Sequence, residues 1–244
     1  MKMTTTVTAI FAVTGALLVP RISGNAHAPM SRHMTRYGLQ SNKLKSNNWS
    51  GYAVSGGPYR SVSARWVEPT GTCHGGEQLA GLWVGLDGFG SHTVEQTGSS
   101  VGCNAGRPVY SAWMEIFPAP STKVAQSVAP GDQFAGSVTY NGSGKYTLRL
   151  ADRTQGWTDT VHVTHQGAAR SSAEAIVEAP SSNSGLLPLA DFGTAHFTNT
   201  TVDGSAIGAL HPAKLVMVNR RGRNKDTVST LSRGGNWKAT WARK

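Results

Sequence analysis

Two polar side chains of the chain stand in mostly apolar segments, and their types suit acid–base chemistry. Gln96 lies in residues 93–98, and Glu178 closes residues 173–178. A carboxylate can accept a proton and an amide can donate hydrogen bonds. A carboxylate in a half-buried strand costs free energy unless a partner satisfies it or the protein uses it. The chain has only 13 Asp and Glu against 23 Lys and Arg, so an acid kept there needs a structural or chemical reason.

Other catalytic patterns in the chain are weaker. Residues 98–102 formally match Gly-x-Ser-x-Gly, but no strand-to-helix turn surrounds Ser100, so we expect no nucleophile there. The histidines are scattered, and a Ser-His-Asp triad stays open without a pattern that favours it. No Cys-x-x-Cys or His-Glu-x-x-His spacing occurs, so we expect no metal and no other cofactor.

The elements that carry these residues are predicted to be strands. Short runs of Val, Ile, Thr, Tyr and Trp alternate with turns such as residues 141–144, and apolar stripes at helical spacing are missing. The 244 residues contain no fixed-period repeat and no internal linker, which indicates one domain with a sizeable core. We therefore expect an all-β antiparallel sandwich. The predicted strands cover residues 49–54, 62–67, 79–87, 110–117, 134–140, 146–152, 157–165, 173–178, 206–207, 215–218 and 237–241.

Period-two alternation sorts the candidate residues onto faces of these strands. If the polar faces line one concave sheet, they form a wet groove with tryptophan walls. For Glu115, a structural hydrogen bond and a functional role are equally compatible with the pattern. Each of the following groups shares one face of its strand: Glu174, Ile176 and Glu178; His92, Val94 and Gln96; Ser111, Trp113, Glu115 and Phe117; and Trp83, Gly85 and Asp87.

The N-terminal segment and the cysteine pair point to export. Residues 1–28 have a basic start, an apolar stretch and small-residue cleavage sites, which is typical of a signal peptide. A membrane anchor is the alternative for this segment, and no other segment is apolar enough to insert stably in a membrane. Residues 29–47 are polar and basic and are expected to form a flexible lead-in or a short pro-segment, followed by the domain at 48–244. Cys73 and Cys103 can form a disulfide in an oxidising, extracellular compartment, with two free thiols as the alternative.

The chain is strongly basic, with a formal net charge of +10 at pH 7. Basic residues concentrate in residues 32–45 and 220–244. Such clusters can bind nucleic acid or an anionic cell surface. Because the interleaved aromatic residues of single-strand binders are sparse, we interpret the clusters as solvated surface and expect a monomer without a nucleic-acid partner.

Five motifs of the chain resemble those of the glutamic peptidases, or eqolisins. They occur in the family's order and at comparable spacing from residue 48 onward; each alone is weak, and five in order are specific. The motifs are NWSGY (48–52), WVGLDG (83–88), QTG (96–98), AWMEIFP (112–118) and AEAIVE (173–178).

The resemblance implies a sandwich of two packed, curved sheets of the jelly-roll or concanavalin type, with a substrate groove on the concave face. It also implies a secreted endopeptidase that uses a Gln/Glu dyad, which falls on Gln96 and Glu178. The nearby Glu174 is left with a supporting role, because the motif match falls on Glu178. Positions that line or support the groove match Trp49, Trp83, Asp87, Trp113 and Glu115.

The two dyad residue types suit peptide hydrolysis. Without a metal or a protein nucleophile, a group must deprotonate water, and the Glu178 carboxylate can do so. The Gln96 amide can donate to the developing oxyanion, and it stays a donor at every pH. Protonated Glu178 can then pass its proton to the leaving amine.

The chain departs from the family pattern at two positions beside the dyad. Ala175 stands where a bulky aromatic is usual, and Glu95 stands where an apolar residue is common, although alternation should turn Glu95 away from the groove. Family members are typically active in acid and often acidic, whereas this chain is basic. A chain with few carboxylates has few groups whose protonation can unfold it, which is compatible with acid tolerance.

The alternatives are a secreted glycoside hydrolase and a non-catalytic sandwich that binds carbohydrate or protein. Glu174 and Glu178 lie four residues apart, roughly 13 Å at strand rise. A retaining pair of carboxyl groups needs about 5–5.5 Å, so these two do not form one. Glu115 with Glu178 stays possible.

Overall fold

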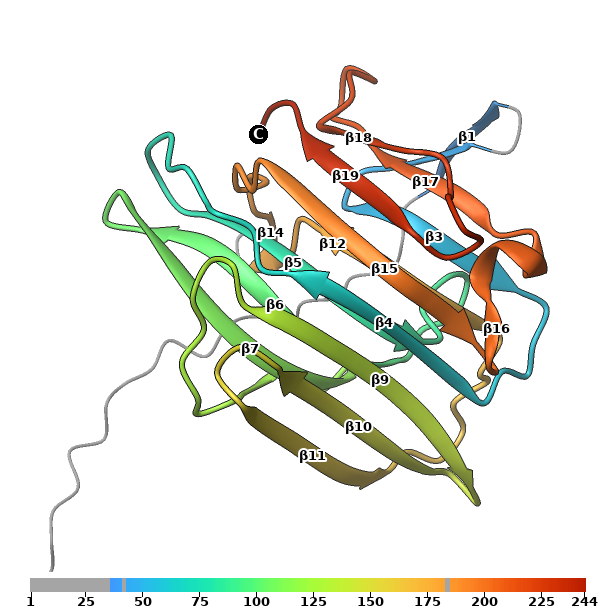
Figure 1. The fold of residues 1–244 in the computed structure, drawn as a ribbon. Helices are drawn as coiled ribbons and strands as arrows, with labels where there is room; N and C mark the ends of the chain where they lie inside the picture. Colours follow the sequence, from blue (N-terminus) through green and yellow to red (C-terminus); the bar gives the residue numbers. More distant parts are fainter. Residues whose placement is uncertain (1–35, 41–42, 183–184) are drawn as a thin grey trace, which may run out of the picture.

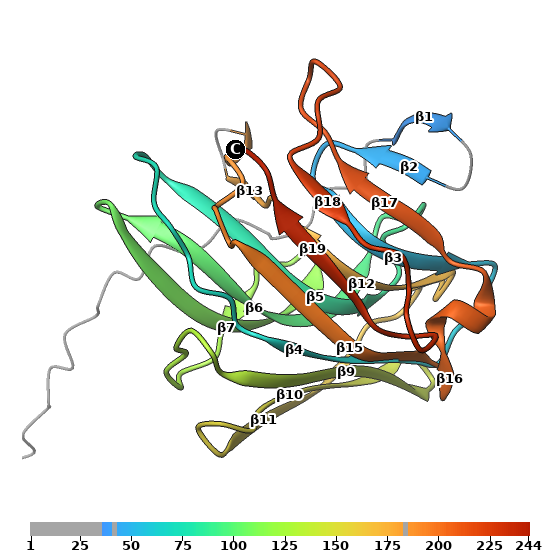
Figure 2. The ribbon, with the colours of Figure 1, turned by 45° about the horizontal axis from the view of Figure 1, so that its top comes forward.

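Two large β-sheets, packed face to face, make up most of the molecule (Figures 1 and 2). The computed structural model describes residues 36–40, 43–182 and 185–244, the first range by its backbone alone. Apart from one pair, the ladders between the described strands are antiparallel; the exception is the parallel pair of β2 and β17. The expected all-β antiparallel sandwich is confirmed.

The nine-stranded sheet carries every strand with a predicted site residue. Its strand order is β1 (Arg36–Gln40), β2 (Lys43–Ser46), β17 (Ala213–Met217), β3 (Trp49–Ser55), β12 (Ser172–Glu178), β5 (Gln78–Leu86), β6 (Val94–Asn104), β7 (Arg107–Phe117) and β8 (Thr122–Lys123).

The eight-stranded sheet covers one face of the first. Its main path runs β11 (Trp157–Thr164), β10 (Lys145–Asp152), β9 (Gln133–Gly142), β4 (Ser61–Val67), β15 (Thr194–Val202), β19 (Trp237–Trp241) and β18 (Asp226–Val228), with β16 (Ser205–Ala206) paired to β15. A small pair, β13 (Ser181–Ser182) with β14 (Gly185–Leu186), and the 3-10 helix η1 (Ile207–Leu210) complete the described elements.

The main apolar core lies between the two sheets, and alternation along each strand decides which side chains enter it. On β12, Ala173, Ala175 and Val177 belong to this core, whereas Ile176 joins a second cluster on the opposite face. Trp66 of β4 packs near the centre, with its ring centroid 5.7 Å from that of Phe134. Full burial of one large apolar side chain stabilises the fold by about 1.5–3 kcal/mol, so this layer holds the sheets together.

The predicted strands are present, and the differences have local causes. β15 falls outside the predicted strands, because its ladder with β4 is irregular between Thr198 and Thr201 and its polar residues obscure the alternation. The strand expected at 206–207 ends at Ala206, since Ile207 begins η1.

The segment expected as a flexible lead-in, residues 29–47, contains two strands. β2 pairs with β17 and β1 pairs with β2, so strand structure begins before residue 48. The expected signal peptide at 1–28 lies outside the described residues. No helix formed by the described part of the chain is long and apolar enough to cross a membrane.

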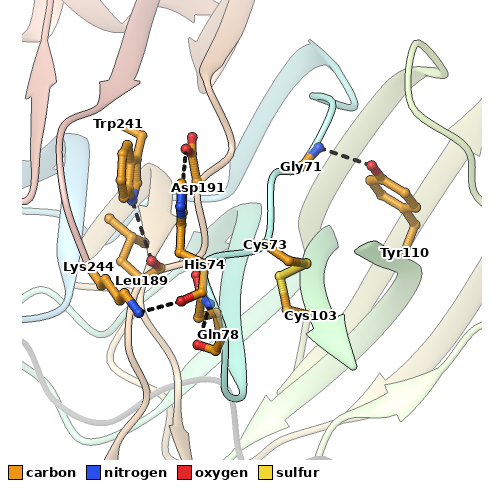
Figure 3. Close-up of a disulfide and its surroundings, with 11 residues drawn as sticks. Gly71, Cys73, His74, Gln78, Cys103, Tyr110, Leu189, Asp191, Trp241 and Lys244 are labelled. Carbon is orange, nitrogen blue, oxygen red and sulfur yellow. Dashed lines mark hydrogen bonds and ion pairs between the residues drawn. A yellow bond between two sulfur atoms is a disulfide. The ribbon is translucent and has the colours of Figure 1, made fainter. Parts of the chain in front are cut away.

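The predicted Cys73–Cys103 disulfide is confirmed, and it joins the loop after β4 to the end of β6 (Figure 3). Its sequence separation is 30, for which a cross-link stabilises the fold by roughly 3–4 kcal/mol. On the same loop, the His74 ring stacks on Trp241 and bonds Asp191 at 2.7 Å. Lys244 Nζ donates to the His74 carbonyl at 2.8 Å. The loop therefore connects the C-terminal strand to the nine-stranded sheet.

Acidic side chains are concentrated inside the molecule. Nine of the 13 Asp and Glu residues are buried. Burial raises the pKa of Glu68 to about 8; a hydrogen bond from Ser99 opposes this rise and the charges of Asp132 and Asp152 add to it. Burial likewise raises the pKa of Glu95 to about 8 and that of Asp226 to about 7. These groups hold their protons in the folded state at pH values where the unfolded chain has lost them.

The free energy of unfolding should therefore fall as pH rises from about 4 to about 8. Unfolded Asp and Glu titrate near pH 4, so across this window the folded chain binds more protons, and stability falls with pH. One such carboxyl contributes a slope of up to about 1.4 kcal/mol per pH unit. Urea unfolding at about pH 4, 6 and 8 measures the slope.

A matched pair of variants tests the cause of this slope. Glu68→Gln should make it shallower, because the buried neutral amide no longer titrates, whereas Glu77→Gln changes an exposed side chain and should leave it unchanged. A stability that increases over this pH range would contradict the assignment.

Candidate active site

The face of the nine-stranded sheet that points away from the main core carries a second apolar cluster, and we call it the site face. Trp49 and Trp83 meet there edge to face, with ring centroids 4.9 Å apart. Aromatic pairs in this geometry stabilise each other by about 0.5–1.5 kcal/mol beyond burial, so the site face has a fixed aromatic floor. The buried members of the cluster are Trp49, Ala53, Trp83, Phe89, Val94, Trp113, Ile176 and Leu215.

Gln96 and Glu178 are buried on the strands that flank β5, and the registers place both on the site face. Gln96 pairs with Gly85, which in turn pairs with Glu174. Glu178 pairs with Gly81, four residues away along β5. Because directly paired residues share a face, the two side chains face the same way but are offset by roughly 13 Å along the strands. No hydrogen bond joins Gln96 to Glu178 in the described part of the chain.

Trp83 lies on β5, between the strands of these two residues. Its Nε1 donates to Glu178 Oε2 at 2.9 Å. At the other end of the indole, Cζ3 lies 2.9 Å from the point where a Cβ on Gly85 would stand, and Gln96 Cβ lies 3.1 Å from that point. Any side chain at position 85 would collide with the indole. The glycine therefore leaves room for the Trp83 indole.

Glu178 is fully buried, and its carboxylate accepts hydrogen bonds from two side chains of other segments. Besides Trp83, Asn48 donates from Nδ2 to Glu178 Oε1 at 3.4 Å. Burial raises the pKa of Glu178 well above the ordinary value, and the negative charge of Glu115 raises it further, while the donated hydrogen bonds lower it. Glu178 is consequently a strong proton acceptor once it is ionised.

Gln96 is oriented by Glu115, its cross-strand partner on β7. Gln96 Nε2 donates to Glu115 Oε2, whereas Gln96 Oε1 has no hydrogen-bond partner in the described part of the chain. A carboxylate accepts but does not donate, so Glu115 selects the amide orientation that turns the NH₂ group toward it. The second hydrogen of that NH₂ group is left to serve another acceptor.

Among the other predicted site residues, Trp49 and Trp113 lie on the site face, but Asp87 is placed differently. Asp87 follows β5, and its carboxylate accepts from the backbone N–H of Arg170 at 2.6 Å and of Ser171 at 2.8 Å. These bonds hold the turn that leads into β12. The geometry gives Asp87 a supporting position for the strand of Glu178, with no contact to either polar side chain among the described residues.

Two supporting contacts are not deducible from residue spacing. Asn48 belongs to the NWSGY motif, and that motif is the only sequence signal for its contact with Glu178. Glu174 accepts from the backbone N–H of Phe89 at 3.1 Å and from the Ser172 hydroxyl. Because one of these donors is a backbone group, no side-chain pattern marks it. Glu174 is therefore hydrogen-bonded to the loop after β5, although Glu174 and Gln96 lie at the same level across the sheet.

The remaining expectations concern Glu95 and Ser100. Glu95 faces away from the site face, as expected, and its carboxylate contacts His165 Nδ1 at 2.6 Å just after β11 of the other sheet. Ser100 lies in the middle of β6 and shares a hydrogen bond with Ser111, so the local chain is a strand and not a strand-to-helix turn. No cluster of three or more His, Cys, Asp and Glu side chains in the described residues is arranged to hold a metal ion.

Comparison with known proteins gives a consistent family. The sequence pattern of the peptidase A4 family matches residues 47–240. Aspergillopepsin-2 of Aspergillus niger is 28% identical over 251 residues, covering 85% of this chain and 89% of that protein.

Solved structures share the same fold. Scytalido-glutamic peptidase with a transition-state analogue inhibitor superposes with a TM-score of 0.71 at 22% identity, covering 80% of this chain and 98% of that one. Aspergilloglutamic peptidase from Aspergillus niger superposes with a TM-score of 0.60 at 26% identity, covering 68% of this chain and 99% of that one.

Two substitutions around Glu178 should move its pKa in opposite directions. Glu115→Gln removes the negative charge that raises the pKa, so the pKa should fall; Trp83→Phe removes a donor that stabilises the carboxylate, so the pKa should rise. The Glu178 carboxyl carbon, followed by NMR across pH, measures both shifts. Shifts of the same sign in both variants would show that the hydrogen bond and the charge do not act as assigned.

Proposed function

The chain belongs to the peptidase A4 family, the glutamic peptidases or eqolisins, and is an endopeptidase that acts on polypeptides; we propose that Gln96 and Glu178 carry its chemistry. The observation behind the proposal is that each side chain has its own positioning partners on one face of one sheet. Glu178 is held by Trp83 and Asn48, and Gln96 is held by Glu115.

In the proposed reaction, Glu178 acts first as a general base. Its carboxylate takes a proton from a water molecule, and the resulting hydroxide adds to the carbonyl carbon of the scissile peptide. The raised pKa of Glu178 favours this step, because a more basic carboxylate takes the proton more readily. The product of addition is a tetrahedral species with a negatively charged oxygen.

Gln96 stabilises that oxygen. One hydrogen of its NH₂ group is bonded to Glu115, and the second is donated to the oxyanion. Because the donor is oriented before the reaction, little reorganisation is needed as the charge develops. Protonated Glu178 then gives its proton to the leaving amine as the C–N bond breaks, which restores the carboxylate.

We also propose that the enzyme works on the acid side of neutrality. The base requires ionised Glu178, so activity should rise with pH through the raised pKa of that group. The buried carboxyls weaken the fold over the same rise in pH. The two opposing trends give activity a maximum between them, and we place that maximum in acid because the resemblance to the glutamic peptidases implies acid activity.

The proposed setting is extracellular, with the enzyme as a monomer. The signal-like residues 1–28 support export, although they lie outside the described residues. The Cys73–Cys103 disulfide is typical of oxidising compartments.

Substitution of either residue should abolish most activity without unfolding the protein. Gln96→Ala should lower kcat/KM by about 10²–10³, the usual effect of losing one oxyanion donor. Glu178→Gln should lower it by at least about 10², because the amide cannot accept the proton. Cleavage of a denatured protein between about pH 2 and 7 measures this, with circular dichroism as the check on folding.

Control variants separate this mechanism from its competitors. Ser100→Ala and Glu77→Gln should retain activity, and inhibitors of serine, metallo- and pepsin-type peptidases should have no effect. Full activity in Glu178→Gln would rule out the proposed base. Release of reducing sugar from polysaccharide, without cleavage of protein, would instead support a glycoside hydrolase.

A further inference from the structure

A cavity of about 500 Å³ opens at one end of the sandwich, where the edges of the two sheets approach each other. Its walls come from β2 and β17 of the nine-stranded sheet, from β18 of the other, and from the turn that precedes β18; Figure 2 shows these elements beside one another. Small-molecule sites in proteins typically enclose about 300–1,000 Å³, so the cavity has the size of a ligand site. Its lining residues are Lys43, Leu44, Lys45, Lys214, Val216, Asn224, Thr227 and Val228.

Three lysines of the cavity share one face of the sheet. Lys43 is the ladder partner of Lys214, and Lys45 is the partner of Val216. The intervening Leu44 and Leu215 pack against the apolar cluster of the site face. By alternation the lysines therefore lie on the opposite face from Gln96 and Glu178, and the cavity is separate from the proposed active site.

The three ammonium groups are not neutralised within the described part of the chain. No Asp or Glu forms an ion pair with Lys43, Lys45 or Lys214 there, and none of the three side chains forms a hydrogen bond. Asp226 is next to the cavity in sequence, but its buried carboxylate accepts from Ser50 Oγ at 2.6 Å. Like charges gathered around a concavity repel one another, and an anion placed among them relieves that repulsion.

Burial and charge both act on Lys214. Partial burial lowers its pKa, and the positive charge of Lys43 lowers it further. The cavity also offers two neutral hydrogen-bonding groups, the Asn224 amide and the Thr227 hydroxyl, both on exposed residues at the rim. Ammonium groups with nearby amide and hydroxyl donors are the partners that phosphate oxygens take in proteins.

We propose that this cavity binds a soluble polyanion that carries two or three linked phosphate groups. Lys43 and Lys45 are two residues apart on one strand, roughly 7 Å, and Lys214 lies beside them on the next strand. The positive charge is thus spread over a length that one phosphate cannot cover. A nucleic-acid strand is disfavoured, because none of the lining residues is an aromatic on which bases could stack.

Calorimetric titration of the whole protein with inorganic phosphate, pyrophosphate and tripolyphosphate at about 50 mM salt tests the proposal. Tripolyphosphate should bind one to one and most tightly, because each added phosphate meets another ammonium group. K43Q/K45Q/K214Q should weaken its binding by at least about tenfold. The matched control, K123Q/K145Q/R153Q, removes the same charge from exposed residues remote in sequence and strand order and should bind as the parent does.

Each outcome of the titrations supports or contradicts polyanion binding in the cavity. Equal weakening in the two triple variants would mean that the anion binds the basic surface in general, and absence of saturable binding in the parent would also overturn the proposal. Peptidase activity of K43Q/K45Q/K214Q should match the parent, which shows that the variant folds. If that variant does not fold, K43Q and T227A, which change exposed residues, should each still weaken tripolyphosphate binding but not by as much.

Discussion

The hydrogen bond from the Trp83 indole to the Glu178 carboxylate is the constraint on which the site depends. A buried carboxylate without donors would be strongly unfavourable, and this donor comes from the strand that lies between the two polar residues. The indole can lie there only because position 85 is a glycine. One residue on the strand between the two polar groups therefore stabilises the buried acid, while the sheet register sets the relative placement of the two groups.

The sequence predicts the fold, and alternation predicts which candidate residues share a face, but the contacts between those residues are not predictable from it. Alternation places Gln96, Trp83 and Glu178 on one face, because the side-chain period of a strand is a property of the backbone. Pairing register, in contrast, depends on packing between distant segments. It places Glu174, rather than Glu178, level with Gln96. β15 is not predicted for a related reason: its bulge breaks the alternation of apolar and polar residues that makes a strand recognisable.

The distribution of charge separates a basic exterior from an interior that holds most of the acidic residues. Most of the few acidic residues are inside, where burial keeps several of them protonated well above the pH at which free carboxyls ionise. Among the described residues, no lysine or arginine forms an ion pair with a carboxylate. Net charge thus reports on the exterior, while the response of stability to pH is set by the interior carboxyls.

Because most of the acidic residues lie inside and most of the basic residues lie outside, the parallel pair of β2 and β17 gathers positive charge without an acidic partner among the described residues. Lys43 and Lys45 on β2 belong to the basic residues 32–45, which the sequence analysis interprets as solvated surface. Lys214 on β17 lies far away in the sequence and outside the basic residues 220–244. The parallel register places Lys43 beside Lys214, and β18 closes the space above them with no carboxylate among the lining residues. Burial lowers the pKa of Lys214, and the positive charge of Lys43 beside it lowers that pKa further. The strand topology therefore creates a concave cluster of lysines whose charge no carboxylate in the described part of the chain neutralises. This cluster distinguishes the β2–β17 edge of the sheet from the rest of the basic surface.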